Sequence, residues 1–279
     1  MVSSNVDRWL RAFGINIAHT VAALKGLSRY WSDFQKITTL NSLAGNRWEI
    51  KPNYPRLIDF YDQSGTARGH YFYQDLIVAQ KIFERNPLNH VDVGSRIDGF
   101  VAHVGSFRRI EVLDIRQLTS AIPNIAFRTC DLLNLPTDLH EYAESVSCLH
   151  VLEHVGLGRY GDPIDLAGHS KGLTNLAKML KPGGTLYLSM PFGIEHVEYN
   201  AHRVFDLRTI VRLVDSVCEI AEFAFVDYGG DLHIPADLNG TLRESGSHRF
   251  SLAIFELRKP ANRNLTAAPH PQLFSTVEC

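Results

Sequence analysis

The sequence predicts a doubly wound α/β fold, in which helices cover both faces of a mainly parallel, seven-stranded β-sheet. Seven short apolar runs typical of buried strands occur between residues 90 and 257, and helix-like segments separate most of them. Polar residues, several of them acidic, follow these runs one after another, although core packing alone would not place an acid there. Ligands of open parallel sheets bind beside the carboxyl ends of the strands. The sequence therefore also predicts which edge of the sheet binds a ligand.

The first strand and the turn after it carry the first signal of a ligand site. The apolar run 90–93 leads into Gly94, and Ser95 directly after it is a helix-start signal. A glycine turn lets the backbone approach a ligand, and the unpaired N–H groups of the next helix attract anionic groups. We expect that helix to cover 97–104 and to end at Gly105. The other predicted strands are 109–113, 125–129, 146–149, 185–189, 221–226 and 251–257.

Two longer helices are predicted between the later strands. Residues 173–180 have helical spacing and stop at the Lys-Pro-Gly-Gly run 181–184. Asp206 is a good N-cap for a helix over 207–217. The connections after the second and third strands are only about a dozen residues long, near the minimum for a parallel crossover. Helices there are expected to be a single turn or absent.

Residues 1–86 are predicted to form an N-terminal helical extension and a connector. From Asn5 to about Trp31, apolar residues recur at intervals of three, four and seven, as on one face of a helix. This face docks on the main domain or, alternatively, lies on a membrane or a partner enzyme with Lys25 and Arg29 at its edge. The apolar residues are Trp9, Phe13, Ile17, Val21, Leu24 and Trp31.

The rest of the chain is predicted to form one main domain over 87–259 and a disordered tail over 260–279. Before that domain, a helical stripe from Phe72 to Phe83 ends at Asn86-Pro87. The aromatic run 69–75 that opens this stripe is either a half-buried helix start or a lid over a cofactor.

Composition and charge exclude several classes of protein. With 45% hydrophobic and 21% charged residues among 279, the chain is ordinary for a globular protein. A formal net charge of −2 gives no basic field, so we expect no nucleic-acid partner. The four cysteines form no C-x-x-C pair, which favours a reducing cytoplasm over a disulfide framework. No apolar run approaches the roughly 18 residues that span a bilayer, and we expect no signal peptide.

Several runs of sequence resemble the motifs of one enzyme family. VDVG at 91–94 is similar to its first motif, and Asp114 lies about 20 residues further on, where the family has its ribose-binding acid. Asp131 and Leu132 match the position that reads adenine, and residues 149–155 and 180–186 are very like the fourth and fifth strands. Over 91–257 the chain thus resembles the class I S-adenosylmethionine-dependent methyltransferases. The resemblance implies a Rossmann-like methyltransferase fold and that cofactor.

Two longer runs, 92–100 and 153–165, resemble more closely an uncharacterised family, DUF268. That family has members in nematodes and in bacterial surface-polysaccharide gene clusters. The resemblance implies O-methylation of a sugar or a glycan-biosynthesis intermediate, so that the expected partner is a small-molecule or glycan acceptor.

The resemblance also implies a set of cofactor-binding residues at the strand ends. The Asp114 carboxylate can accept both ribose hydroxyls, unless it is merely a surface acid. Asp131 can accept from the adenine amine, unless it caps a turn. Arg96 stands where the family commonly has glycine, and we hypothesise that it pairs with the methionyl carboxylate rather than with Asp98. The predicted set is Asp92, Gly94, Ser95, Arg96, Asp114, Asp131, Leu132 and His150.

Catalysis is assigned to two residues directly after the fourth strand and to one further downstream. Methyl transfer is an in-line displacement that depends on positioning, and a hydroxyl acceptor must also lose its proton to a base. We expect His154 to be the base, with Glu153 orienting the acceptor or cofactor and His202 as a further candidate. Alternatively, Glu153 and His154 only brace the loop over 156–165.

Substrate binding is assigned to that glycine-spaced loop. Its alternative role is a structural turn held by one of its acids. The predicted substrate-binding residues are Arg159, Tyr160, Asp162 and Asp165.

Other chemistries fit the sequence less well. The spacing of His150, Glu153 and His154 matches an inverted zinc-protease motif, but Gly156 and Gly158 would break the helix that this motif needs. We therefore expect no metal site, and a divalent metal on the nearby acids is not favoured. An NAD-dependent enzyme would need a G-x-G-x-x-G turn, which is absent. A non-catalytic module that binds a nucleoside cofactor stays open, because a fold does not guarantee chemistry.

Overall fold

The computed structural model describes residues 4–62 and 64–261, and the contacts divide the chain into two compact units. The first unit covers Met1–Thr66 and the second Ala67–Cys279. The division falls about twenty residues before the predicted start of the main domain, because the helix over 70–85 packs on the sheet of the second unit. Most of the predicted tail, 262–279, lies outside the described residues. No described helix is both long enough and apolar enough to cross a membrane.

The described part of the first unit contains two α-helices, α1 (Ser4–Ala12) and α2 (Ile17–Leu43), where the sequence predicted one. Gly14 adopts a positive φ of 80° and ends α1, and the Asn16 side chain then caps α2 by accepting from the His19 N–H at 3.0 Å. The helix α2 also extends beyond the predicted end at Trp31, because no proline or glycine occurs between Trp31 and Gly45.

The second unit contains an eight-stranded sheet with the strand order β3-β2-β1-β4-β5-β10-β8-β9. The strands β1 to β5 pair in parallel, and β10 is antiparallel to both β5 and β8. All seven predicted strands are present, and the eighth, β9, is a two-residue strand at the sheet edge. The strands are β1 (His90–Val93), β2 (Ile110–Asp114), β3 (Ile125–Thr129), β4 (Ala143–Leu149), β5 (Leu180–Gly193), β8 (Glu219–Val226), β9 (Leu232–His233) and β10 (Phe250–Arg258).

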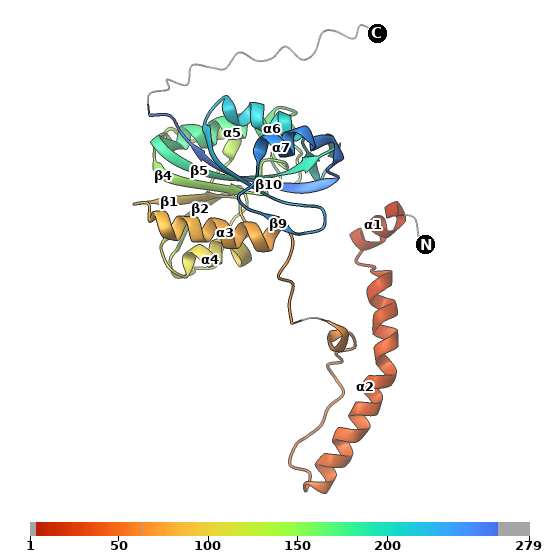
Figure 1. Cartoon of the computed structure of the whole chain (residues 1–279). Helices are drawn as coiled ribbons and strands as arrows, with labels where there is room; N and C mark the ends of the chain where they lie inside the picture. The colour runs from red at the N-terminus through yellow and green to blue at the C-terminus, as the bar shows by residue number, and fades with distance from the viewer. Residues whose placement is uncertain (1–3, 63, 262–279) are drawn as a thin grey trace. The chain divides into compact units, whose positions relative to one another are not determined.

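Helices cover both faces of this sheet (Figure 1). On one face lie α3 (His70–Arg85) and α4 (Ala102–Gly105), and on the other lie α5 (Gly168–Met179), α6 (Leu207–Asp215) and α7 (Leu238–Arg243). The doubly wound, mainly parallel α/β fold is thus confirmed. A separate hairpin, β6 (His196–Glu198) with β7 (His202–Val204), follows β5.

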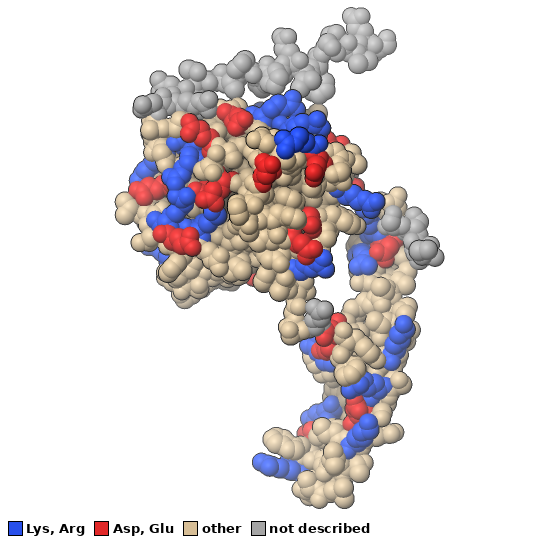
Figure 2. Space-filling view, viewed as in Figure 1, with Lys and Arg blue, Asp and Glu red and all other residues tan. Residues whose placement is uncertain are grey.

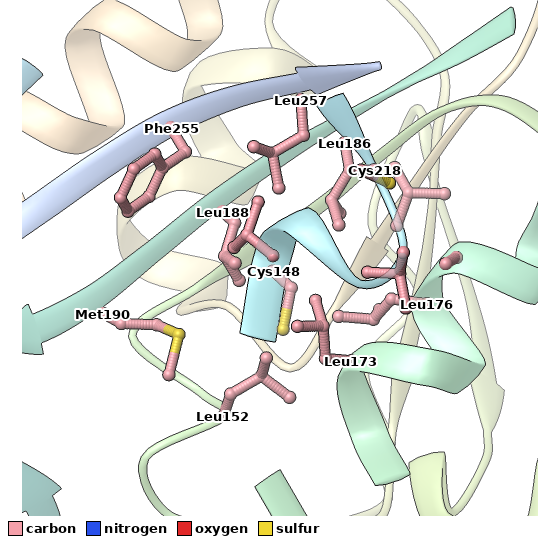
Figure 3. Close-up of a cluster of buried hydrophobic side chains, with 14 of the residues drawn as sticks. Cys148, Leu152, Leu173, Leu176, Leu186, Leu188, Met190, Cys218, Phe255 and Leu257 are labelled. Atoms are coloured by element: carbon pink, nitrogen blue, oxygen red, sulfur yellow. The ribbon is translucent and has the colours of Figure 1, made fainter. Parts of the chain in front are cut away.

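The alternation of side chains along β5 supplies a core on each face. Leu186, Leu188 and Met190 pack toward α5 and α6, while Tyr187 packs toward α3. Figure 3 shows the first of these cores, in which the β5 leucines face Leu173 and Leu176 of α5. Both faces of the central strands are therefore buried, as parallel sheets require.

The connections agree with the sequence in part. No helix joins β2 to β3, and only two 3-10 turns join β3 to β4, as their short lengths predicted. Asp206 caps α6 as predicted, accepting from the Arg208 N–H at 2.8 Å. The helix predicted over 97–104 is instead a π-helix over Ile97–Val101 followed by α4, because Gly99 has non-helical dihedral angles.

His90 is fully buried in the central strand β1. Its two ring nitrogens lie 2.8 Å and 3.1 Å from the hydroxyl oxygens of Ser145 and Ser147 on β4. Burial, with the Arg108 charge adding to it, lowers the pKa of His90 to about 3. In the unfolded chain the histidine has an ordinary pKa near 6.5 and is protonated below pH 6.5. In the folded chain His90 stays neutral at the same pH.

We expect this difference to cost about 2 kcal/mol of folding stability between pH 7 and pH 5. The sign follows because a depressed histidine pKa gives stability that is complete above pH 6.5 and is lost as the pH falls. The free energy of unfolding, measured with urea at pH 7 and pH 5, should fall less in His90→Gln than in the wild type, by about this amount. The exposed His140→Gln serves as control, and an identical pH dependence in His90→Gln and wild type would refute the assignment.

Candidate functional site

A cavity of about 380 Å³ opens at the carboxyl ends of β1, β2, β3 and β4 in the second unit. Twelve of the fifteen predicted site residues line it, so the fold brings most of the candidates together around one cavity. These residues are Gly94, Arg96, Asp114, Asp131, Leu132, His150, Glu153, His154, Arg159, Tyr160, Asp162 and His202. The roles assigned to them stay predictions.

Asp92 and Ser95 lie beneath the cavity rather than in its wall. The buried Asp92 carboxylate accepts from the Ser95 N–H at 2.9 Å, the Ser95 hydroxyl at 2.6 Å and the Ser147 hydroxyl at 2.5 Å. Burial raises the pKa of Asp92 to about 6 against these hydrogen bonds. The direct cofactor contact implied for both residues is corrected here: their side chains hold each other and the turn at Gly94, whose φ is 74°.

Asp114 ends β2 with its carboxylate already engaged. It accepts from Arg116 Nε at 3.0 Å, Nη2 at 2.7 Å and the backbone N–H at 2.8 Å. The same guanidinium lies over the ring of Tyr160, 4.4 Å from its centroid. A ribose that binds Asp114 must therefore compete with Arg116. Sequence reasoning missed this arginine, although a cation two residues after an acid could have signalled the pair.

Asp131 caps a turn, which was its alternative role, and it also lies on the cavity wall. Its carboxylate accepts from the Leu133 N–H at 2.9 Å and from the Asn134 side chain at 2.5 Å, so it caps the 3-10 turn Leu132–Asn134. It also lines the cavity beside β3. Capping fixes the orientation of the carboxylate without removing it from the cavity wall.

Arg96 makes the salt bridge that was its alternative role. Its guanidinium lies 3.0 Å from the Asp98 carboxylate and 5.1 Å from the centroid of the Tyr71 ring. Because Arg96 nevertheless lines the cavity, its pairing with a methionyl carboxylate stays a hypothesis.

A buried cluster of charged and titratable groups follows β4. His150 takes a positive φ of 58°, and its Nδ1 lies 2.5 Å from Glu153 Oε1. Burial alone would raise the pKa of Glu153, but the nearby rings of His150 and His154 outweigh it and hold that pKa below its ordinary value. The second carboxylate oxygen, Oε2, is buried and has no hydrogen-bond partner among the described residues. Glu153 is therefore a buried anionic acceptor that borders the cavity and has one carboxylate oxygen without a partner among the described residues.

His154 is held in one tautomer. Its Nδ1 lies 2.6 Å from the carbonyl oxygen of Ala201, which can only accept, so Nδ1 carries the proton. Its Nε2 lies 3.7 Å from Glu153 Oε1. Burial lowers the pKa of His154 although Glu153 opposes the shift, so the ring is neutral at pH 7. The ring therefore offers an unprotonated Nε2, which a general base needs, and the Glu153 carboxylate lies near enough to stabilise the protonated ring.

His202 on β7 is the third predicted catalytic residue. Its ring is 6.4 Å from that of His154 and 5.5 Å from that of Phe250, measured between centroids. Burial and the neighbouring His154 lower the pKa of His202. His202 lines the same cavity as His150 and His154.

The loop over 156–165 is held from within by its own acids. Asp162 accepts from the N–H groups of Gly156 at 2.7 Å, Gly158 at 3.3 Å and Tyr160 at 3.2 Å. Asp165 pairs with Lys171 at 2.5 Å and does not line the cavity, which corrects its implied contact with substrate. Arg159 and Tyr160 remain on the cavity side.

A buried arginine that the sequence did not single out supports this loop from below. The Arg203 guanidinium lies 2.7 Å from the carbonyl oxygen of Val155 and 3.3 Å from that of Asp165. Its backbone N–H also donates to the carbonyl oxygen of Glu153 at 3.0 Å. The loop is therefore fixed to β7 at both of its ends.

The start of α3 closes one side of the cavity. His70 stacks on His150 at 5.5 Å, with its Nδ1 3.4 Å from His150 Nε2, and Tyr71 lies 4.9 Å from the same ring. Burial lowers the pKa of His70 to about 4. His70 and Tyr71 belong to the aromatic run 69–75, for which a lid over the cofactor was one of two predicted roles. Both residues line the cavity.

Among residues 4–62 and 64–261, no group of three or more His, Cys, Asp or Glu is arranged to hold a metal ion. The residues after His150 form turns rather than the helix that a zinc-protease motif would need.

The order and direction of the strands identify the fold. The strand order, with one antiparallel strand, β10, inserted between β5 and β8, is that of the class I S-adenosylmethionine-dependent methyltransferase fold. The chain itself belongs to the DUF268 family, whose model, described as a Caenorhabditis protein of unknown function, matches residues 109–257, just over half of the chain. None of the curated proteins matches the sequence.

Several solved structures are similar at low sequence identity. N-methyltransferase NodS from Bradyrhizobium japonicum, with S-adenosyl-l-homocysteine, is 13% identical and covers 69% of this chain and 89% of its own, with a TM-score of 0.45. The [4+2]-cyclase SpnF is 15% identical and covers 86% and 97%, with a TM-score of 0.49. The 1,6-didemethyltoxoflavin-N1-methyltransferase from Burkholderia thailandensis is 11% identical and covers 82% and 89%, with a TM-score of 0.47.

Proposed function

We propose that this protein transfers a methyl group from S-adenosylmethionine to a hydroxyl group of a small-molecule acceptor. The observation that carries the proposal is His154, a neutral base held in one tautomer on the wall of the strand-end cavity. We further propose that the acceptor is a sugar or a glycan-biosynthesis intermediate in the cytoplasm. That part rests on the family resemblance and on cysteine usage rather than on a contact in the cavity.

The residues present fit the cofactor. A cavity of about 380 Å³ is within the range of small-molecule sites. Asp114 and Asp131 offer carboxylates to ribose hydroxyls and an adenine amine, and the partnerless Glu153 Oε2 offers an acceptor to an ammonium or hydroxyl group. Arg96 supplies a cation of the sign that a methionyl carboxylate needs.

Bound S-adenosylmethionine supplies an electrophilic methyl group on a positively charged sulfur. The protein then has two tasks, to hold the acceptor oxygen in line and to take its proton. His154 Nε2 accepts that proton, and Glu153, 3.7 Å away, stabilises the imidazolium that forms. Tyr71, Tyr160 and Phe250 line the cavity and give it an aromatic surface.

Methyl transfer can be tested by product formation. The full-length protein is incubated with S-adenosylmethionine and a panel of sugar nucleotides, sugar phosphates and simple glycosides, and S-adenosylhomocysteine is measured. We expect production that depends on a hydroxyl-bearing acceptor and an acceptor heavier by one methyl group. Binding of the donor without turnover across all acceptors would instead favour a non-catalytic cofactor-binding module.

A further inference from the structure

We propose that residues 4–62, here called the arm, bind a lipid surface that carries anionic headgroups. The helix α1 is clearly two-sided when its residues are placed at 100° intervals. Val6, Trp9 and Leu10 share one side, and Phe13 follows in the turn directly after the helix. Trp9 and Phe13 are 70% and 77% exposed, which is unusual for such large apolar side chains. Arg8 and Arg11 lie on the opposite side, as in helices that rest on a membrane surface.

The helix α2 continues the exposed apolar surface. The chain that returns after α2 covers only one of its sides: Gly26 is closed over by Leu57, and the Tyr30 hydroxyl donates to the carbonyl oxygen of Pro52 at 3.0 Å. The other side repeats apolar residues at intervals of three and four that stay exposed within the arm. These are Ile17, Val21, Leu24, Leu27 and Trp31.

All three tryptophans of the chain lie in the arm, and all are exposed. Trp9, Trp31 and Trp48 are 70%, 50% and 66% exposed. Tryptophan is favoured at the boundary between headgroups and acyl chains because its ring is apolar and its N–H can still donate to water or a headgroup.

Charge favours an anionic surface. The arm carries eight Lys and Arg against five Asp and Glu, a formal net charge of +3, whereas residues 67–279 carry 20 against 25, a net charge of −5. Figure 2 shows the cationic side chains of the arm spread along its helical part. A second arm would carry the same positive charge, so a copy of this chain is a less favourable occupant than an anionic lipid.

The test is co-sedimentation of the full-length protein with vesicles. Vesicles of phosphatidylcholine alone are compared with vesicles containing a quarter of phosphatidylserine, at low and high salt. We expect binding to the anionic vesicles, weaker at high salt because the headgroup charges are screened. The variant Trp9→Ser/Phe13→Ser should bind at least about tenfold more weakly, since each lost aromatic anchor removes apolar burial in the lipid.

A matched control is Phe83→Ser/Leu88→Ser, which removes two exposed apolar side chains from the second unit and should bind like the wild type. Circular dichroism establishes that each variant keeps its helices. The proposal is overturned if the wild type ignores both kinds of vesicle or if the arm variant binds as well as the wild type. It is equally overturned if the wild type is a dimer that only the arm variant dissociates, because the arm would then be an interface between copies.

Discussion

His154→Gln is expected to lower the rate of methyl transfer by about 10²–10⁴-fold and to leave the affinity for S-adenosylmethionine within about twofold of the wild type. Glutamine keeps a donor for the carbonyl oxygen of Ala201, so the fold of the loop is preserved. It has no basic nitrogen, and the acceptor hydroxyl then loses its proton only to water. The effect should therefore fall on turnover and not on binding.

The pH profile separates a catalytic loss from a structural one. Burial lowers the pKa of His154, so the wild-type kcat/KM should rise with pH through a pKa below 6.5 and level off by pH 7. The residual activity of His154→Gln should not show this rise of kcat/KM with pH. The exposed His140→Gln is the control and should keep both rate and profile. An unchanged rate in His154→Gln would remove His154 as the base and leave it as a brace for the loop.

Asp114→Asn is expected to weaken the binding of S-adenosylmethionine by about 30- to 100-fold. Loss of a charged, bidentate hydrogen-bond acceptor for the ribose hydroxyls corresponds to roughly 2–3 kcal/mol of binding free energy. Asp138→Asn is a matched control, because Asp138 forms a similar pair with Arg128, at 2.8 Å, outside the cavity. It should leave the affinity unchanged.

Arg116→Gln sharpens this test. Because the Arg116 guanidinium donates to both oxygens of the Asp114 carboxylate, removing it frees these acceptors. The affinity of Arg116→Gln for S-adenosylmethionine should therefore be at least that of the wild type. If Arg116→Gln instead weakens binding as much as Asp114→Asn, the pair acts as one structural unit. Asp114 would then not be the ribose acceptor.

The sequence predicted the sheet well because buried strands leave a local signal. Each of the seven apolar runs became a strand, and the shortness of the connections after β2 and β3 correctly limited their helices. The break between α1 and α2 was missed because a single glycine costs a helix only about 1 kcal/mol, and a positive φ at Gly14 is not visible in the sequence. The two-residue β9 carries too few residues to show a pattern.

The sequence predicted that the candidate residues gather at the strand ends, but not how their side chains pair. A strand end can be located from sequence, so Asp114 and His154 could be placed at one edge of the sheet. The side chains that face them come from distant segments: His70 reaches His150 across 80 positions, and Arg203 braces the loop from β7. Only the folded chain brings such partners together.

The central claim is that the strand ends of this sheet form one pocket for S-adenosylmethionine. Isothermal titration of the full-length protein with S-adenosylmethionine and, separately, with NAD tests it most directly. The account predicts a single S-adenosylmethionine site that Asp114→Asn weakens and Asp138→Asn does not, with no heat from NAD. A protein that binds NAD and gives no heat with S-adenosylmethionine would contradict it.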